Sequence, residues 1–489
     1  MKFTTFSLLL HSAGFGAAQL IGPVGPTTTL GHKTRECNVL NYGAVNDNST
    51  DIAGALEAAF SDCVLNHPGS RLVVPEGEYL LNRSVVLSNG TNWAFQLEGL
   101  ISLGYGGNYS VDRELILQGY AGAQPLNDTI NGEGDHLFLE NGLVIVNAVD
   151  FEFFSSTGKG AFQGQGYIWR NSNNTVRPRL IRLISPINAS VHDLILVDSP
   201  KFHTVFDFAI NLEVYHLTIR GANLGSYDGV DVVGTNYWVH DIEVTNRDEC
   251  VSVKSPSNHA LVENLVCNQA GSGISIGSLN VSASIANIHA RNISIIQGNN
   301  IAFIKTYPGG SGYVTNVTFE NFRSKASLYG MNINQYWQNT NIPDTGSVKL
   351  SNLVFRNFSG SVANGVQRPP LYLVANDLTF ATNVTVERFS VWTETNDYVV
   401  NKISNVFGKG DDSYGPSNGI KTLAPSESPV PYTSTITITA SPTDWVVPPL
   451  PTWAVPNTGY GTNIPIPVYT PAPLWRPQGD YDKHYWGSF

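Results

Sequence analysis

The chain has 489 residues, a formal net charge of −11 and only 14% charged residues. The low basic content argues against nucleic-acid binding, and no internal apolar run is long enough to span a bilayer. Asn, Ser, Thr, Val and Gly are plentiful, whereas long helical runs of Ala, Glu, Lys and Leu are scarce. This composition favours β structure with many turns.

The N-terminal stretch "MKFTTFSLLLHSAGFGAAQL" has the features of a secretory signal. Lys2 precedes a short apolar segment, and small residues follow at Gly16, Ala17 and Ala18. We expect residues 1–18 to be a signal peptide, so that the mature protein is secreted, extracellular and soluble. The alternative is a first buried strand.

Four cysteines and several glycosylation sequons agree with export. An even number of cysteines in a secreted chain indicates disulfides. We expect local pairing, of Cys37 with Cys63 and of Cys250 with Cys267. Asn-x-Ser/Thr sequons can be glycosylated in an exported protein, and they include Asn82, Asn108, Asn188, Asn292, Asn316 and Asn357.

An amphipathic helix is expected at residues 50–64, before any repeat begins. Its apolar residues fall on one face: Ile52, Leu56, Ala59, Phe60 and Val64. We interpret this helix as a cap, because the exposed strand edges of a first coil would otherwise invite association.

A repeat dominates the middle of the chain. Each unit has alternating apolar residues followed by Asn, Gly, Ser or Asp, as in "VHDLIL", "VYHLTI", "VHDIEV" and "VENLVC". Units start at Val191, Val214, Val239, Val262, Ala290, Val314 and Leu350. A recurring period in this range indicates stacked structural repeats.

The repeat predicts an all-β, single-domain right-handed parallel β-helix over residues 19–405. Leucine-rich and helical repeats need patterns that are absent, whereas period-2 alternation with short polar turns fits one repeat per coil. A β-propeller is the main alternative, but its blades need longer repeats. Residues 406–489 form a Pro/Ser/Thr-rich extension, either a linker or a tail lying on the helix.

Acidic residues cluster on adjacent repeats. Asp228 and Asp231 lie in "GSYDGVDVVG", and Asp248 and Glu249 lie in "VTNRDECVSVKSP". Equivalent positions on neighbouring coils are roughly 4.8 Å apart, so these carboxylates should share one surface. Adjacent residues of a strand point to opposite sides, so a bend or bulge is expected at Asp248–Glu249. Such a cluster favours acid/base catalysis, with a calcium site or turn residues as alternatives.

Around these residues the sequence resembles the polygalacturonase family, glycoside hydrolase family 28, and especially its rhamnogalacturonase branch. The family motifs Asn-Thr-Asp, Asp-Asp, Gly-His-Gly and Arg-Ile-Lys correspond, in the same order, to Ser226-Tyr227-Asp228, Asp248-Glu249, Gly271-Ser272-Gly273 and Phe303-Ile304-Lys305. The resemblance runs from about residue 35 to 400. The Asp-Glu pair and "IKTYPGGSG" are similar to the rhamnogalacturonases.

Two departures bear on the substrate. Ser272 replaces the polygalacturonase histidine, and Phe303 replaces its arginine. Rhamnogalacturonan I alternates galacturonate with neutral rhamnose, and an arginine buried against rhamnose would be an unpaired charge. Lys305 remains, and one cation suits one galacturonate.

The resemblance implies a role for each candidate residue and needs no cofactor and no metal. Asp248 is the general acid, Asp228 and Glu249 position and deprotonate the attacking water, and Asp231 tunes its neighbours. The remaining candidates are substrate-binding: Lys305, Gly271, Gly273, Lys254 and Tyr307, with Arg291, Tyr336 and Trp337 as further residues of the groove.

We therefore expect a monomeric, inverting endo-hydrolase that cleaves α-D-galacturonosyl-(1,2)-L-rhamnose bonds in the pectic polysaccharide rhamnogalacturonan I, with an acidic pH optimum. An exo-acting rhamnogalacturonan galacturonohydrolase and a polygalacturonase are the nearest alternatives. A pectate-type lyase would need calcium and a basic proton abstractor. A non-catalytic β-helix binder has no need for these acids in this order.

Overall fold

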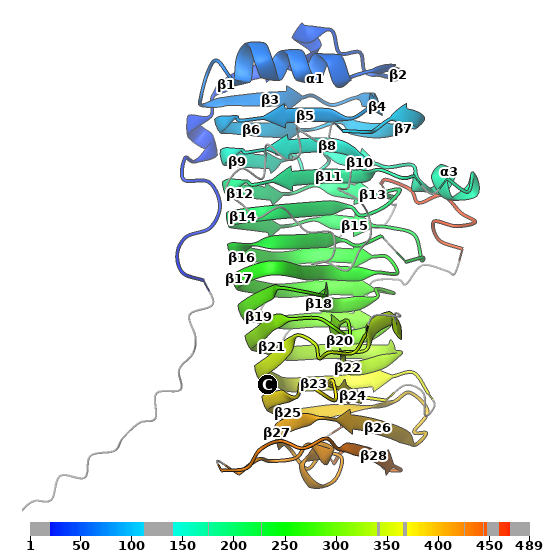
Figure 1. Cartoon of the computed structure of the whole chain (residues 1–489). Coiled ribbons are helices and arrows are strands. Elements are labelled where there is room, and N and C mark those ends of the chain that lie inside the picture. The colour runs from blue at the N-terminus through cyan, green and yellow to red at the C-terminus, as the bar shows by residue number, and fades with distance from the viewer. Residues whose placement is uncertain are drawn as a thin grey trace, which may run out of the picture.

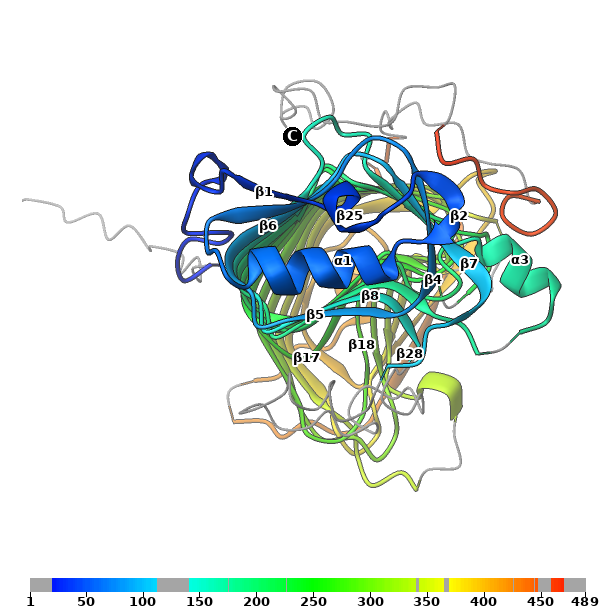
Figure 2. The same cartoon turned by 90° about the horizontal axis from the view of Figure 1, so that it is seen from above.

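The computed structural model describes residues 20–469 except 112–139, 175, 226, 340–342, 365–368, 425, 444 and 447–458. The predicted architecture is confirmed: the described chain winds into a right-handed parallel β-helix, an elongated stack of coils (Figures 1 and 2). None of the helices in this part of the chain is long and apolar enough to cross a membrane.

Three parallel ladders form the sides of the solenoid. The first contains β1 (Arg35–Asn38), β3 (Ser70–Val74), β6 (Thr91–Leu97), β9 (Val149–Phe154), β12 (Ile187–His192), β14 (Thr204–Tyr215), β16 (Val230–Thr245), β17 (Glu249–Asn268), β19 (Ala283–Ile296), β21 (Gly312–Ser327), β23 (Lys349–Val362), β25 (Ala381–Thr393) and β27 (Val406–Gly410).

The second ladder contains β2 (Asp47–Asp51), β4 (Glu78–Arg83), β7 (Leu100–Asn108), β10 (Ala161–Gln163), β13 (Ile195–Val197) and β15 (Thr218–Arg220), and continues through the last residues of β16, β17, β19, β21, β23 and β25. The third contains β5 (Val85–Ser88), β8 (Asn141–Val146), β11 (Arg179–Ile184), the first residues of β14, β16 and β17, then β18 (Ser272–Leu279), β20 (Asn300–Thr306), β22 (Tyr329–Asn334), β24 (Leu371–Val374), β26 (Val399–Ser404) and β28 (Thr433–Ile438).

Few helices accompany the strands. The described ones are α1 (Ala53–Ala59), which continues into the π-helical turn η3 (Phe60–Val64), α3 (Gly166–Asn171), and the short 3-10 turns η1 (Leu30–His32), η2 (Val39–Tyr42), η5 (Trp337–Asn339) and η6 (Pro416–Gly419). The predicted cap is confirmed, because Ile52, Leu56 and Phe60 are buried against the first coil and α1 covers its end (Figure 2). At the other end, β28 runs antiparallel to β26.

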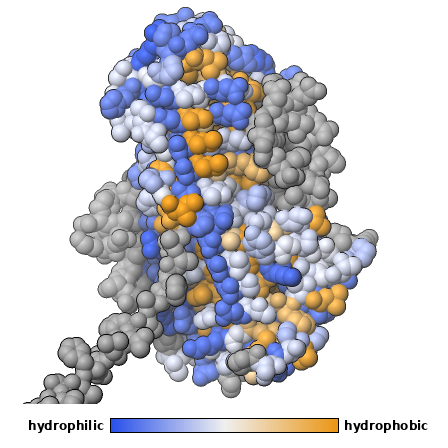
Figure 3. Space-filling view, turned by 60° about the vertical axis from the view of Figure 1, so that its left-hand side comes forward, coloured by the Kyte–Doolittle hydropathy of each residue, from blue (hydrophilic) through white to orange (hydrophobic). Residues whose placement is uncertain are grey.

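The interior is a continuous apolar stack. Phe322, Phe358 and Phe389 occupy equivalent positions on β21, β23 and β25, with ring centroids 4.8 and 5.1 Å apart. Outward-facing side chains also align, so that columns of like character run along the molecule, and Figure 3 shows an apolar column beside hydrophilic ones. A parallel solenoid therefore converts the repeat period into columns of equivalent side chains.

Asparagine ladders hold the corners between sides. The amide nitrogen of Asn287 donates to Asn258 at 2.9 Å, Asn316 donates to Asn287 at 3.2 Å, and Asn352 donates to Asn316 at 3.1 Å. Asn287, Asn316 and Asn352 have φ between 55° and 57°. Asparagine tolerates this left-handed conformation better than other side chains, which explains why the repeat ends in Asn.

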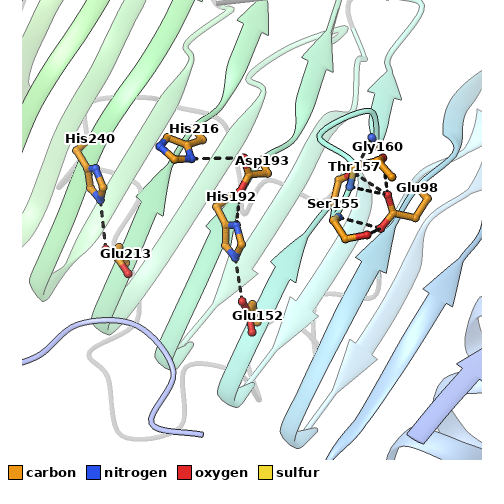
Figure 4. Close-up of polar contacts among 11 residues, drawn as sticks. Glu98, Glu152, Ser155, Thr157, Gly160, His192, Asp193, Glu213, His216 and His240 are labelled. Carbon is orange, nitrogen blue, oxygen red and sulfur yellow. Dashed lines mark hydrogen bonds and ion pairs between the residues drawn. The ribbon is translucent and has the colours of Figure 1, made fainter. Parts of the chain in front are cut away.

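A second column, on the outer face of the first ladder, combines histidines with carboxylates (Figure 4). The ring of His192 stacks on Tyr215 at 4.4 Å, and Tyr215 stacks on His240 at 5.2 Å. His192 contacts Glu152 at 3.0 Å and Asp193 at 2.8 Å. His240 contacts Glu213 and Asp241 in the same manner. We call His192, Tyr215, His240 and these four acids the histidine stack.

Both predicted disulfides are present, Cys37–Cys63 and Cys250–Cys267. The first ties β1 to the capping helix. The second joins the two ends of β17, directly beside Glu249.

Candidate active site

Three carboxylates meet at one corner of the solenoid. Asp228 precedes β16, and Asp248 lies in the corner between β16 and β17, where Glu249 begins the next strand. Val230 is paired with Val251, so Asp228 and Glu249 lie at neighbouring levels of the third ladder. One oxygen of each acid lies within 4.8 Å of the others. Because β16 ends at Thr245 and a bend follows, the predicted break in strand geometry is present.

The environment separates the proton affinities of these acids. Burial of Glu249 opposes its ionisation, but Lys305, with Nζ 2.7 Å from Oε1, outweighs burial and holds the pKa of Glu249 well below its usual range. Burial, and then the charges of Asp248, Asp231 and Glu249, raise the pKa of Asp228 well above its usual value. The environment therefore favours the ionised form of Glu249 and the protonated form of Asp228.

Lys305 is the cation bound to Glu249 in this cluster. Burial alone would lower its pKa, but the charges of Glu249 and Asp248 raise it. Its ammonium also lies 5.6 Å from the ring centre of Phe303 and 5.3 Å from that of Trp337. Sequence reasoning placed Lys305 in the groove but did not foresee the ion pair with Glu249.

Two buried polar residues hold the backbone behind the acids. Nδ1 of His203 donates to the carbonyl of Asp228 at 3.0 Å, because a carbonyl can only accept. Burial lowers the pKa of His203 to about 4, so the ring is neutral at higher pH. The amide of Asn246 donates to the carbonyls of Tyr227 at 2.9 Å and Glu249 at 3.2 Å. Asn246 thereby joins the two segments that carry the acids.

The acids line an open groove of about 500 Å³ on the third ladder. Most of the predicted site residues are brought together there: Asp228, Asp248, Glu249, Lys254, Gly271, Lys305 and Tyr307. Further lining residues include Lys201, Arg247, Phe303, Trp337 and Gln338. The rings of Phe303 and Trp337 meet edge to face at 5.2 Å and give the groove an apolar wall.

The two glycines with a predicted role at the sugar lie differently: Gly271 lines the groove and Gly273 does not. A Cβ on Gly271 would lie 2.9 Å from the backbone of Asp248, and the Gly271 N–H donates to the Asp248 carbonyl at 2.6 Å. Gly271 therefore permits a close backbone approach that fixes Asp248. A Cβ on Gly273 would meet Ile293 and Ile295 in the core, so Gly273 faces away from the groove.

Three other residues lie outside the groove lining. Asp231 is buried on β16, and its charge helps to raise the pKa of Asp228. Arg291 pairs with Glu263 at 2.6 Å on the first ladder. The hydroxyl of Tyr336 accepts from the N–H of Asp377 at 2.9 Å. Alternation along a strand indicates whether a side chain points outward. It does not indicate on which of the three sides of the solenoid the residue lies.

A divalent cation is a poorer fit than a proton for this cluster. The three oxygens have the spacing of a cation site, and hard cations prefer carboxylates. However, one Glu249 oxygen is already bound to the Lys305 ammonium, whose positive charge would repel a metal ion. The arrangement favours acid/base chemistry.

A parallel β-helix with a carboxylate cluster in an open groove defines a class of polysaccharide-cleaving enzymes. Residues 71–407 match the family model described as glycosyl hydrolases family 28. The chain belongs to this family and is a glycoside hydrolase, as the motif resemblance implied.

The curated relatives refine this placement. The chain is 38% identical to "Rhamnogalacturonase A" of Emericella nidulans, over 92% of this chain and 80% of the relative. It is 37% identical to "Rhamnogalacturonase A" of Aspergillus aculeatus, over 92% of each chain. The match to "Probable rhamnogalacturonase B" of Aspergillus fumigatus is 39%, over 88% of this chain and 77% of the relative.

Solved structures support the fold. The endo-xylogalacturonan hydrolase of Aspergillus tubingensis superposes with a TM-score of 0.58 at 23% identity, covering 81% of this chain and 100% of that one. The polygalacturonase of Erwinia carotovora gives a TM-score of 0.53 at 15% identity, covering 76% and 94%.

Proposed function

We propose that the protein is a secreted, monomeric rhamnogalacturonan hydrolase that cleaves α-D-galacturonosyl-(1,2)-L-rhamnose bonds inside rhamnogalacturonan I. The observation that carries the proposal is the Asp228, Asp248 and Glu249 cluster, paired with Lys305 and opening on a groove. Relatives named rhamnogalacturonase, similar over most of the chain, support the substrate. Residues 1–18 are the proposed signal peptide and residues 19–405 the catalytic unit.

The groove supplies chemistry for two kinds of sugar. Phe303 and Trp337 offer an apolar surface that suits the methyl group of rhamnose. Lys201, Arg247 and Lys254 line the same groove and suit galacturonate carboxylates. An ammonium has three donors, so Lys305 can hold Glu249 and a sugar carboxylate together.

In the proposed mechanism Asp248 protonates the glycosidic oxygen, while Glu249 and Asp228 hold the attacking water. Asp248 is the least buried of the three acids and therefore reaches the substrate most easily. Since the environment favours a proton on Asp228, we propose that this proton passes to Asp248 when substrate binds. Their oxygens lie within 4.8 Å of each other, a gap that one bridging water can span.

Inversion at the anomeric carbon is the proposed outcome, although the acids are closer than the roughly 6.5–9.5 Å common in inverting enzymes. Glu249 is a poor nucleophile, because it is buried and its oxygen is bound to Lys305. We therefore place water beside the three acids. Proton NMR of the first turnover checks this step, because inversion gives the β-anomer first and retention gives the α-anomer.

The substrate is tested by parallel digests of debranched rhamnogalacturonan I and homogalacturonan, with products separated by size. Mid-sized oligomers with rhamnose at the non-reducing end, from the first polymer alone, are expected. Galacturonate oligomers from homogalacturonan would instead identify a polygalacturonase. Release of single galacturonate residues would identify an exo-enzyme, and retention of the polymer without cleavage would identify a binder.

A further inference from the structure

The C-terminal extension returns to the middle of the solenoid, on the side of α3 (Figures 1 and 2). Ile466 is buried with Ala161, Ile195 and Val197 of β10 and β13. The side-chain amide of Gln163 donates to the carbonyl of Ile466 at 3.4 Å, and the hydroxyl of Tyr469 donates to the carbonyl of Lys159 at 2.9 Å. Residues 459–469 thus form a packed segment, which we call the strap.

The strap contacts the loop that carries Asp228. The N–H of Asn223 donates to the carbonyl of Tyr460 at 3.3 Å. Gly461 has φ +72°, and a Cβ there would lie 2.6 Å from Cα and 2.7 Å from Cβ of Ala222. The turn at Gly461 therefore packs directly against Ala222 at the start of this loop, six residues before Asp228.

Arg170 of α3 connects the strap to the residue next to Asp228. Its Nε donates to the carbonyl of Gly461 at 2.9 Å, and its guanidinium also pairs with the buried Asp198. The same guanidinium lies 5.1 Å from the ring centre of Tyr227, which is fully buried. Tyr227 is held from its other end by Arg177, which donates to the hydroxyl.

These contacts form one continuous support from the strap through Arg170 and Tyr227 to the backbone of Asp228. On the inner side, His203 and Asn246 hold the same backbone. Reacting groups misplaced by about 1 Å can cost about 10²-fold in rate. A loop held on both sides has little freedom to move.

We propose that the strap is a positioning element of the active site, which holds the Asp228 loop against the solenoid through Gly461 and Arg170. The proposal rests on the catalytic role proposed above for Asp228. It makes the C-terminal extension part of the catalytic unit, although the sequence set it apart as a tail.

The test compares Gly461→Ala with Gly43→Ala. Gly43 has a similar left-handed φ of +91°, but no atom lies within 4 Å of its Cβ position. Both variants place alanine at a positive φ, which strains the backbone. Only Gly461→Ala also pushes the strap away from Ala222. We expect Gly461→Ala to lose at least about tenfold in kcat, with KM within about twofold, because Asp228 acts on water and protons.

The pH profile of kcat should also shift in Gly461→Ala, since the proton affinity of Asp228 depends on its distance from Asp248 and Glu249. A purely structural strap would lower the melting temperature and leave the profile unchanged. A second pair, chains ending after residue 458 and after Tyr469, should differ in kcat in the same way.

Equal kcat and equal pH profiles in Gly461→Ala and Gly43→Ala would overturn the proposal. Asp228→Asn separates this failure from that of the proposed function. If Asp228→Asn is inactive while Gly461→Ala is normal, only the strap is refuted. If Asp228→Asn keeps wild-type kcat, the assigned site itself is wrong.

Discussion

The catalytic corner and the histidine stack place acids on adjacent coils by the same geometry, with opposite results. In the histidine stack, His192 lies between Glu152 and Asp193 (Figure 4). His240 likewise lies between Glu213 and Asp241. At the catalytic corner, Asp228, Asp248 and Glu249 crowd together, with Lys305 bound to Glu249 and the charge of Lys254 acting on Asp228 and Glu249. Stacking brings like charges together in both regions. In the histidine stack, bonds to His192 and His216 outweigh burial and lower the pKa of Asp193, whereas burial and the neighbouring acids raise the pKa of Asp228.

The largest difference between the two regions is expected when one carboxyl group is removed from each of them. We expect Asp248→Asn to lose about 10³-fold in kcat, within the usual range for general acid catalysis. Asp193→Asn removes the same group from the histidine stack and should keep kcat within about twofold. Initial rates on rhamnogalacturonan I check both variants. Comparable losses would mean that the cluster is not the catalytic centre.

Removing the Lys305 ammonium should leave Glu249 without its bound cation, unlike the acids of the histidine stack. In Lys305→Met the partner that depresses the pKa of Glu249 is gone, and burial then raises that pKa. We expect about 10²-fold lower kcat/KM and an acid limb of the pH profile shifted upward, because Glu249 must be ionised to act.

The matched control for Lys305 is Arg291→Met. It removes a cation paired with Glu263 on the other ladder and should leave the pH profile unchanged. An unshifted acid limb in Lys305→Met would exclude Glu249 as the group that must ionise.

The smallest expected effect concerns the contribution of the histidine stack to the free energy of unfolding. Burial lowers the pKa of His192, but its bonds to Asp193 and Glu152 outweigh this and raise it overall. A raised pKa gives stability that is complete below the unfolded value near 6.5 and is lost as pH rises through the folded value.

We therefore expect His192→Gln to lower the free energy of unfolding by about 1 kcal/mol at pH 5 and by less at higher pH. Denaturant unfolding across this pH range measures it. His32→Gln, at an exposed histidine, serves as the control and should show no such trend. A constant difference at all pH values would argue against protonated histidine as the cause.

The fold and the core of the site were predictable from the sequence because both follow from the repeat. Period-2 alternation identified the solenoid, and stacking placed Asp228 beside Asp248 and Glu249. The positions of Gly273 in the core and of Arg291 on the first ladder were not predictable, because they depend on the residue at which the chain turns each corner. Nor were His203, Asn246 and the strap, since their contacts join segments that no local pattern relates.

The asparagine ladders have a consequence for the carbohydrate coat of a secreted chain. A glycan is attached to the amide nitrogen of a sequon, and in Asn292, Asn316 and Asn357 that nitrogen already donates to the asparagine of the preceding coil. These sequons arise because corners require Asn and outward strand positions favour Thr or Ser. Asn82 and Asn108 are exposed and lie outside the asparagine ladders. For the proposed secreted protein, the mass added by glycans should therefore be concentrated near the N-terminal end.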